Sequence, residues 1–587
     1  MIARFLKAAL DRVHASWRRW REAPYDRMLA EGVRLQSAGD HAGAQAHYHR
    51  VLEHSPDHAN AHYLLGIGYG RRGNHAPALE HLRRAVTRRP DFVDAHADLG
   101  NVLRLSGDAA GAEASYRRAV ALDPGIARAH YGLGVLARHS GRLEEAATSY
   151  AHALRLGLDA DELLRAYTEL LCDLQQFARA STLLYERLAR DPARTEAHRC
   201  LGIVYRRMWQ PEHALEHYRA AQRLGAVDAG LLTELGLTLQ ELGMVNEAMT
   251  SFDAALALQP EFPLARWHRA ILQLMLGEYS TAWQDYETRF VSEDRPQRSF
   301  DAARWRGEDL SNSVLLVYAE QGLGDEIMFA SCLPEVIQRA QHCIVDCHPK
   351  LAALFRRSFP AASIHAGLQT DSSAWLAQFP RPEYQIPIGS LPALLRNSLA
   401  QFPQHRGYLE ADPARIAYWR TKLATLGSGL KVGISWRGGT QASRSPLRSL
   451  DLQQLLPVLK VSEVKFVDLQ YTDTAQERTQ LKAAHGIDIA HWPDAIEDYD
   501  ETAALLCALD LTISVCTAVI HLAGALGRPV WVMAPFSPEW RYGISGAAMP
   551  WYPSAMVFRQ PRYGAWEPVI EQVRDALQLR AESARAG

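Results

Sequence analysis

Residues 314–336, with the sequence VLLVYAEQGLGDEIMFASCLPEV, decide the fold of the C-terminal half of this chain. The stretch begins with a run of apolar residues, 314–319, which is typical of a strand covered on both faces of a parallel sheet. A polar turn with two glycines follows, and a stretch of helical periodicity follows the turn. This order brings backbone N–H groups at the start of a helix close to an anion or a polar substrate. The stretch therefore predicts an α/β domain with a binding site at residues 320–325.

Strand-like and helix-like runs continue to alternate from this stretch to the C-terminus. Such alternation predicts parallel sheets with helices on both faces. We expect two Rossmann-like lobes, 313–427 and 428–587, that face one cleft, and a last helix over 566–579 that packs back across the lobes. The further strands are predicted at residues 343–347, 363–366, 384–388, 431–436, 464–469, 511–515 and 529–533.

The N-terminal half, residues 26–290, carries eight repeats with a period of 34 residues. Each repeat has an alanine, at positions 44, 78, 112, 146, 180, 214, 248 and 282. A bulky side chain stands four residues after each alanine, and in six repeats a glycine stands five residues before it. The fifth and sixth repeats depart from this pattern, with Gln175 and Trp209 in place of the glycine.

This pattern resembles the tetratricopeptide repeat over about 265 residues, 26–290. The resemblance implies an all-α superhelix of stacked helix pairs with a concave groove. Its small residues let paired helices approach closely, and the interhelix glycine supplies a left-handed turn. We expect the groove to bind a protein or glycan acceptor. The alternative is a spacer or an oligomerisation arm.

The length and composition indicate several domains and exclude some classes of partner. A chain of 587 residues is too long for one hydrophobic core, and 48% hydrophobic with 22% charged residues is ordinary for a globular protein. A net charge of −2 gives no reason to expect nucleic acid as a partner. The seven cysteines show no zinc-type spacing, so we expect reduced thiols in a cytoplasmic protein without a metal site.

The N-terminal segment, residues 1–25, is basic and amphipathic, but it lacks the long apolar core of a signal peptide. We expect a helix that caps the repeats. A weak contact with an anionic membrane surface is the alternative. The most apolar region of the chain, 503–519, is interrupted by Asp510 and falls short of the roughly 20 residues that a membrane span needs.

Three stretches of the second lobe carry candidate binding residues. Trp436, Arg437 and Gly438 follow a predicted strand, where open α/β sheets bind their ligands. Arg448 lies in a basic loop, and an arginine there can hold a phosphate with two hydrogen bonds. Thr517 begins a helix after a buried strand, a position suited to a diphosphate.

Together, the turn at 320–325 and the segment 517–532 resemble bacterial proteins that join tetratricopeptide repeats to a GT-B glycosyltransferase of the heptosyltransferase type. The resemblance spans roughly residues 305–566. It implies a GT-B-like pair of lobes and inverting transfer of a sugar from a nucleotide-activated donor. The same architecture is similar to that of the O-linked N-acetylglucosamine transferases, although only Asn101 matches their ladder of groove asparagines.

The resemblance also implies roles for individual residues. Asp325 corresponds to the general base that takes the acceptor proton. The acceptor side would be formed by Glu320, Gln321, Gly322 and Gly324, and the donor diphosphate would be met by Trp436, Arg437, Gly438, Arg448, Thr517 and His521. No metal and no cofactor beyond the donor sugar nucleotide are expected, because a helix dipole and cationic side chains replace the ion.

One position departs from the family pattern. Cys516 stands where heptosyltransferase-like sequences commonly carry an acid. The absence of that acid removes a hydrogen-bond acceptor from the nucleotide side. The departure leaves a second hypothesis open, a non-catalytic adaptor whose repeats bind a partner and whose GT-B lobes are degenerate.

Overall fold

The computed structural model describes residues 25–292, 298–367, 373–439 and 445–586. The amphipathic segment predicted to cap the repeats or touch a membrane lies outside these residues, apart from Tyr25. The chain divides into two compact units, Met1–Ala226 and Val227–Gly587. Among the described residues, no helix is both long and apolar enough to cross a bilayer.

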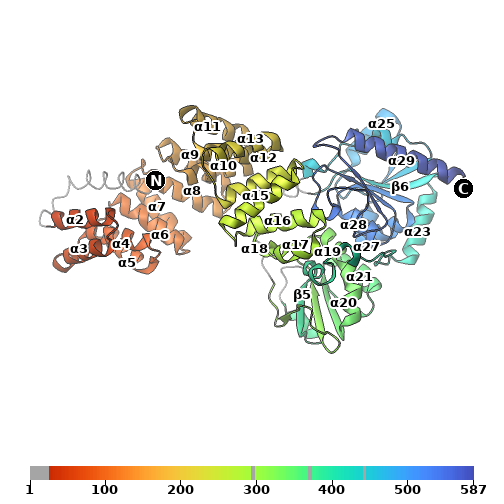
Figure 1. The fold of residues 1–587 in the computed structure, drawn as a ribbon, viewed down its shortest axis with the longest axis horizontal. Helices are drawn as coiled ribbons and strands as arrows, with labels where there is room; N and C mark the ends of the chain where they lie inside the picture. The colour runs from red at the N-terminus through yellow and green to blue at the C-terminus, as the bar shows by residue number, and fades with distance from the viewer. Residues whose placement is uncertain (1–24, 293–297, 368–372, 440–444, 587) are drawn as a thin grey trace. The chain divides into compact units, whose positions relative to one another are not determined.

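The described part of the first unit consists of antiparallel helix pairs, one pair for each of the first six predicted repeats (Figure 1). The pairing follows the 34-residue period of the sequence, and the predicted all-α repeat fold is confirmed. Its helices are α2 (Asp26–Ser37), α3 (His41–His54), α4 (Ala59–Arg71), α5 (His75–Arg88), α6 (Val93–Leu105), α7 (Ala109–Leu122), α8 (Ala127–His139), α9 (Leu143–Arg155), α10 (Asp161–Asp173), α11 (Phe177–Arg190), α12 (Thr195–Arg207) and α13 (Pro211–Arg223).

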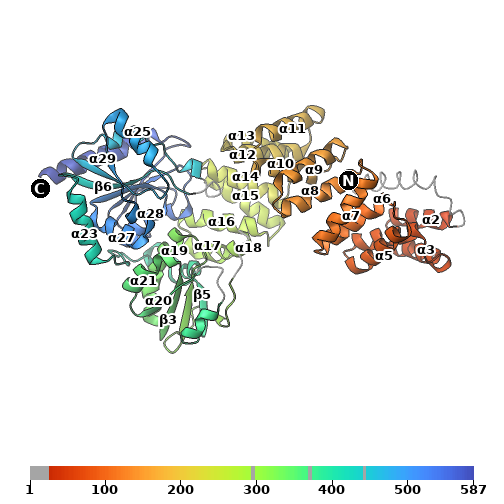
Figure 2. The same cartoon turned by 180° about the vertical axis from the view of Figure 1, so that it is seen from behind.

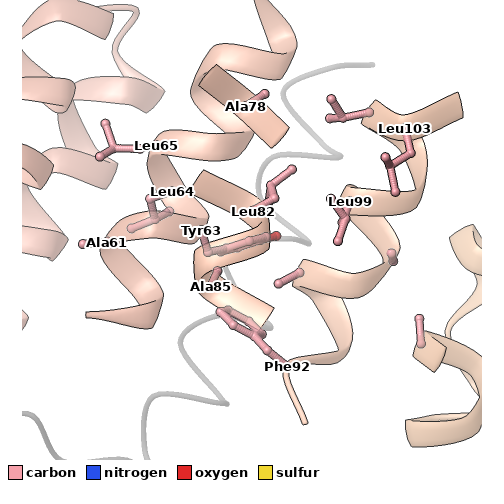
Figure 3. Close-up of a cluster of buried hydrophobic side chains, with 14 of the residues drawn as sticks. Ala61, Tyr63, Leu64, Leu65, Ala78, Leu82, Ala85, Phe92, Leu99 and Leu103 are labelled. Carbon is pink, nitrogen blue, oxygen red and sulfur yellow. The ribbon is translucent and has the colours of Figure 1, made fainter. Parts of the chain in front are cut away.

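The repeating alanine and the bulky residue after it form the interior of the helix stack. All eight alanines and all eight bulky side chains are buried. In most repeats the bulky side chain packs on a glycine of the first helix. A Cβ atom on Gly100, for example, would lie 2.7 Å from the Tyr116 ring. Figure 3 shows Leu82 of α5 among the side chains of α4 and α6, including Tyr63 and Leu99.

The turn between the two helices of a repeat keeps its left-handed conformation even without glycine. Gln175 and Trp209 have φ angles of 58° and 59°, close to the 73° of Gly141 at the equivalent position. Non-glycine residues adopt this region at a cost in free energy. The packing of the repeat therefore imposes the left-handed turn, and glycine only lowers the free energy that this conformation costs.

The second unit begins with the last two repeats and continues into both lobes. These repeats are formed by α14 (Ala229–Glu241), α15 (Val245–Leu258), α16 (Pro263–Leu276) and α17 (Tyr279–Tyr286), followed by the short helix α18 (Arg289–Ser292). The repeat pattern ends near residue 290, as the sequence indicates, but the boundary between compact units lies at 226/227. The difference arises because α16 and α17 pack on the lobes, where the Trp283 indole donates to the carbonyl of Arg396 (2.9 Å).

The first lobe contains a five-stranded parallel sheet in the order β1-β5-β2-β3-β4. Val317 of β2 pairs with Val345 of β3 on one side and with Ile386 of β5 on the other. Figure 2 shows this sheet from behind, in green, with α20 beside it. Its elements are β1 (Ala303–Arg304), β2 (Val314–Tyr318), α19 (Leu323–Phe329), α20 (Leu333–Arg339), β3 (His342–Cys347), α21 (Ala352–Ser358), β4 (Ala362–Ala366), β5 (Tyr384–Pro387) and α22 (Pro392–Leu395).

The second lobe contains a six-stranded parallel sheet in the order β11-β10-β9-β6-β7-β8. Ile434 of the central strand pairs with Asp468 and Ile513. The lobe comprises α23 (Pro413–Ala424), β6 (Leu430–Ser435), α24 (Leu456–Leu459), β7 (Val464–Asp468), α25 (Ala475–His485), β8 (Ile489–Ala490), α26 (Pro493–Glu497), α27 (Tyr499–Ala508), β9 (Leu511–Val515), α28 (Ala518–Ala525), β10 (Val530–Ala534), β11 (Ala555–Arg559) and α29 (Glu567–Ala586).

The fold class predicted from the sequence, tetratricopeptide repeats followed by two α/β lobes, is confirmed. Three strands were not predicted. β1 and β8 have only two residues each, β1 lies between the predicted repeats, which end at 290, and the first predicted lobe, which begins at 313, and β11 is the edge strand of its sheet. The last helix also differs from the expectation, because α29 packs on α24 and β11 of its own lobe instead of back across both. Its apolar face, including Val569 and Leu577, belongs to the core of that lobe.

Candidate functional site

Each sheet has one place where the strand order reverses. In the first lobe this place lies between β2 and β5, and in the second lobe it lies between β6 and β9. Open α/β sheets bind ligands at such points, outside the carboxyl ends of the strands. The predicted turn 320–325 and the predicted contact residues Trp436, Arg437 and Gly438 follow the strands that border these points.

At the first of these points, two predicted acceptor-side residues are held by the last repeat. Glu320 is buried and accepts hydrogen bonds from Arg289 (3.0 Å) and from the side chain of Gln321 (3.0 Å). Gln321 in turn accepts a hydrogen bond from the Tyr286 hydroxyl (3.1 Å). These contacts fasten the loop to α17 and α18. Glu320 and Gln321 therefore help to position the loop, and their contact with an acceptor stays a prediction.

Asp325 lies in the first turn of α19 and forms an ion pair with Arg541 of the second lobe. Burial alone would lower the pKa of Arg541, but the charge of Asp325 raises it above its ordinary value. Gly322 is the residue before α19, in extended backbone conformation. Sequence reasoning missed Arg541, whose only local signal is an arginine between two aromatic residues, Trp540 and Tyr542.

Helices α19 and α28 pack against each other across the two lobes. Gly324 makes this approach possible, because a Cβ atom there would lie 3.0 Å from the His521 ring and 3.5 Å from the Cα atom of Ala518. The structure thus brings Gly324 and Asp325 of the first lobe together with His521 and Arg541 of the second.

Thr517 is the residue before α28 and lies at the point of the second lobe where the strand order reverses. Its hydroxyl lies 2.9 Å from that of Ser514, and its methyl group packs against Gly438. A Cβ atom on Gly438 would lie 2.7 Å from this methyl group and 2.9 Å from the carbonyl oxygen of Cys516. Gly438 and Thr517 are therefore in contact at the β6/β9 reversal, where the sequence predicted the diphosphate.

His521 is buried behind Thr517. Its Nδ1 lies 3.1 Å from the Tyr552 hydroxyl, and its Nε2 lies 3.5 Å from the Tyr542 hydroxyl. Burial, and then the charges of Arg541 and Arg448, lower the pKa of His521 well below its ordinary value. The imidazole is therefore neutral near pH 7, so it acts as a hydrogen-bonding group and not as a cation.

Cys516 is buried in the second lobe near three arginines. Burial raises the pKa of its thiol to about 11, although Arg448, Arg541 and Arg559 all act to lower it. Arg448 itself is mostly buried, forms an ion pair with Glu539, and has a pKa lowered by burial. Three arginines thus lie near a neutral thiol, and two of them, Arg448 and Arg541, are already paired with the carboxylates of Glu539 and Asp325.

Two of the predicted donor-side residues lie apart from this cluster. Trp436 is 0% exposed within the core of the second lobe, and its indole N–H donates to Glu477 (3.1 Å). Arg437 forms an ion pair with the same carboxylate. The Trp436 side chain is enclosed by the core, so the prediction that it contacts a diphosphate is wrong for this side chain.

Glu326, next to Asp325, is a buried acid that the sequence analysis did not consider. It is 1% exposed and accepts a hydrogen bond from the backbone N–H of His348 (2.8 Å). Burial, with the nearby charges of Asp346 and Glu320, raises its pKa to about 8. Asp325 and Glu326 are thus neighbours in different environments, one paired with an arginine and one kept protonated.

Among curated proteins, this chain has a relative whose length it largely covers. Protein FlbA of Caulobacter vibrioides is 31% identical over 457 residues, which are 69% of this chain and 76% of that protein. The chain belongs to the FlbA family. This FlbA-family protein also matches tetratricopeptide repeat profiles at residues 32–91, 65–125, 97–161 and 233–299.

Among solved structures, this FlbA-family protein is similar to several tetratricopeptide repeat proteins. A repeat protein from Parabacteroides merdae is 13% identical, with 42% of this chain and 98% of that chain covered and a TM-score of 0.36. YrrB, described as a TPR protein with an unusual peptide-binding site, is 24% identical, with 32% and 97% covered and a TM-score of 0.26. Neither likeness bears on function.

Proposed function

We propose that this FlbA-family protein is an inverting glycosyltransferase that moves a sugar from a nucleotide-activated donor to a protein or surface-glycan acceptor. The observation that carries the proposal is the meeting of Asp325 with Arg541 and with helix α28, because it places a carboxylate of one lobe beside an arginine and a helix N-terminus of the other. Tetratricopeptide repeats bind proteins and peptides, and the repeats would recruit the acceptor.

The chemistry requires a base and a means of stabilising the leaving group. The Asp325 carboxylate would take the proton of the acceptor hydroxyl, whose oxygen attacks the anomeric carbon as the bond to the diphosphate breaks. Arg448 and Arg541, with the N-terminus of α28 beginning after Thr517, would offset the charge that develops on the departing diphosphate. A donor diphosphate would also compete with Asp325 for Arg541 and so release the carboxylate to act as base.

The test is the Asp325→Asn variant, which keeps the shape of the side chain and removes its basicity. We expect sugar transfer, measured as release of nucleoside diphosphate from a panel of nucleotide sugars and as label incorporated into acceptor, to fall about 10²- to 10⁴-fold. Asp494→Asn, an exposed change outside the site, should leave transfer unchanged. Unchanged turnover in the Asp325→Asn variant would exclude Asp325 as the base.

The second candidate is a non-catalytic adaptor, and the burial of a neutral thiol at position 516 favours it. In that case no nucleotide sugar should raise the melting temperature of the protein. A ligand at 100 times its dissociation constant should add about 2.7 kcal/mol to stability. If no nucleotide sugar shifts the melting temperature, the result therefore supports the adaptor. A selective shift with one donor would favour the transferase over the adaptor.

A further inference from the structure

A hollow lies between the second helices of the fourth and fifth repeats, α9 and α11. Its volume is about 730 Å³, and α10 contributes Tyr167 to its lining. Another cavity of the first unit, of about 540 Å³, is lined mainly by the first helices α2, α4, α6 and α8, which form the groove predicted for the acceptor. No described residue lines both cavities. The hollow is therefore separate from the groove.

The fifth repeat departs from the others in a way that opens this hollow. Its first helix, α10, carries Tyr167 and Thr168 where the first helices of five other repeats carry a Leu-Gly pair, at 65–66, 99–100, 133–134, 201–202 and 235–236. At those glycines an added Cβ atom would lie within 2.7 Å of a side chain of the second helix. Thr168 is buried and has such an atom. Consequently α10 and α11 contact each other less than the two helices of any other described repeat.

The lining of the hollow is cationic. The described residues that line it include one acid, Glu186, and four arginines, Arg155, Arg179, Arg187 and Arg190. Arg187 is paired with Asp159 (2.9 Å), which does not line the hollow. Arg155 and Arg190 are exposed and form no ion pair within the part of the chain that the structure describes. At least two guanidinium groups are thus available to an anion.

Apolar surface lies between the arginines. Leu154 of α9 and Leu183 of α11 line the hollow and pack against the core of these repeats. The Arg179 guanidinium lies 5.6 Å from the centroid of the Tyr167 ring. Burial raises the pKa of Tyr167, whereas the charges of Arg179 and Arg155 act to lower it, so both cations lie near this hydroxyl. The hollow therefore combines an apolar surface with a cationic rim.

The spacing of the arginines indicates an extended ligand. Arg179 and Arg190 are 11 residues apart on α11. This separation corresponds to about 16 Å along a helix, so one phosphate or carboxylate group cannot reach both. A strand of nucleic acid would offer phosphates to the arginines but no aliphatic side chains to Leu154 and Leu183. A peptide with acidic and apolar side chains satisfies both parts of the lining.

We propose that the hollow between α9 and α11 is a docking site for an acidic amphipathic segment of a partner protein. The carboxylates of the segment pair with Arg155, Arg179 and Arg190, and its apolar side chains pack on Leu154 and Leu183. The proposal goes beyond the proposed function, because the site uses neither the lobes nor the groove and does not depend on sugar transfer.

The experiment measures binding of a labelled synthetic peptide, with glutamate and leucine at helical spacing, to the full-length protein by fluorescence anisotropy. A scrambled peptide of the same composition and a single-stranded RNA oligonucleotide are the comparison probes. We expect the patterned peptide to bind more tightly than either of them. Its affinity should fall as the salt concentration rises, because salt screens exposed charges.

Two variants test the position of the site. The double variant Arg155→Glu/Arg190→Glu changes exposed, unpaired side chains, so it should melt like the wild type and bind the peptide about 10-fold more weakly or less. Ala178→Glu places a carboxylate in the hollow, within the first turn of α11, where an acid does not destabilise the helix. It should also weaken binding without lowering the melting temperature.

A matched control makes the same change of charge elsewhere. Arg83→Glu/Arg223→Glu alters exposed residues of α5 and α13, and Arg223 lies two 34-residue periods after Arg155. This variant should bind the peptide like the wild type.

The outcomes decide the inference independently of any transferase assay. Peptide binding that weakens in the two hollow variants and not in the control would support the docking site. Absence of peptide binding, or equal binding in the wild type and the hollow variants, would overturn it. Equal binding of the scrambled peptide would overturn the amphipathic segment, and tighter binding of RNA would overturn a protein as the partner.

Discussion

The two neighbouring acids of the site, Asp325 and Glu326, differ in whether the carboxyl group is ion-paired or neutral. Asp325 faces an arginine of the other lobe, whereas Glu326 on the same turn points into the first lobe and has a pKa raised to about 8. Burial near other acids favours the protonated form of a carboxyl, and an arginine partner favours the ionised form. The two adjacent acids therefore differ in their surroundings: Asp325 is held in an ion pair, whereas Glu326 is a neutral support for the turn that carries both.

The raised pKa of Glu326 makes a pH-dependent contribution to stability. Below pH 4.5, its ordinary pKa, the group is protonated in both the folded and the unfolded state. Between pH 4.5 and about 8 only the unfolded state releases the proton, so the stability contributed by this group falls as the pH rises, at most about 1.4 kcal/mol per pH unit.

Glu326→Gln keeps the acceptor for His348 and removes the titration. We expect its melting temperature to match that of the wild type at pH 4 and to exceed it increasingly toward pH 8. Thermal denaturation of both proteins across this range checks the prediction. A difference that stays constant with pH would mean that Glu326 titrates alike in both states.

At the scale of elements, the repeats depend on close contact between a glycine of the first helix and a ring of the second. The same contact recurs at Gly32, Gly100, Gly134, Gly202 and Gly236, where an added Cβ atom would lie within 2.7 Å of the nearest ring atom. Interiors at such density do not absorb an added methyl group without displacement. In these five repeats the glycine therefore allows the close approach of the two helices.

Two glycine-to-alanine changes, in the first helices of neighbouring repeats, should change the stability of the repeats in opposite directions. Gly100→Ala places a Cβ atom 2.7 Å from the Tyr116 ring and should destabilise the repeats by about 1–3 kcal/mol. Gly68→Ala, inside α4 with nothing within 4 Å of the added atom, should stabilise them by about 0.5–1 kcal/mol, because alanine favours helix. Urea denaturation followed by circular dichroism measures both. A loss of stability in Gly68→Ala similar to that in Gly100→Ala would show that the ring contact is not the cause.

At the scale of the second unit, the last repeat takes part in building the site. Trp540 packs against Trp283 (5.7 Å between ring centroids) and Tyr286 (5.9 Å) of α17. Arg541, the partner of Asp325, is the next residue. The buried Arg289 of α18 also holds Glu320, at the start of the loop that leads to Asp325. The last repeat thus positions both partners of the central ion pair.

This coupling predicts how fragments of the chain behave. Residues 227–587 should unfold as one cooperative unit, because they keep the aromatic and ionic contacts of the last two repeats. Residues 298–587 should melt at a clearly lower temperature or aggregate, because the loss of these repeats exposes Trp540 and takes Arg289 away from the buried Glu320. Removing one partner of a buried ion pair typically costs about 3–5 kcal/mol. Equal melting temperatures for the two fragments would show that the repeats are only attached to the lobes.

The sequence by itself determined the repeats and the two α/β lobes, because period and apolar patterning are local and act over short stretches. The 34-residue spacing predicted the buried alanines, and the apolar run 314–319 predicted β2. The two glycine turns were also located correctly at strand ends, since that geometry needs only the strand and the residues after it.

Only the tertiary structure decided which side chains meet. Arg541 is 216 residues from Asp325 in the chain, and no local pattern marks their pairing. Trp436 follows a strand as a ligand contact would, yet it is enclosed by the core. Burial and long-range contact set the charge and accessibility of these residues, and both depend on how distant segments pack.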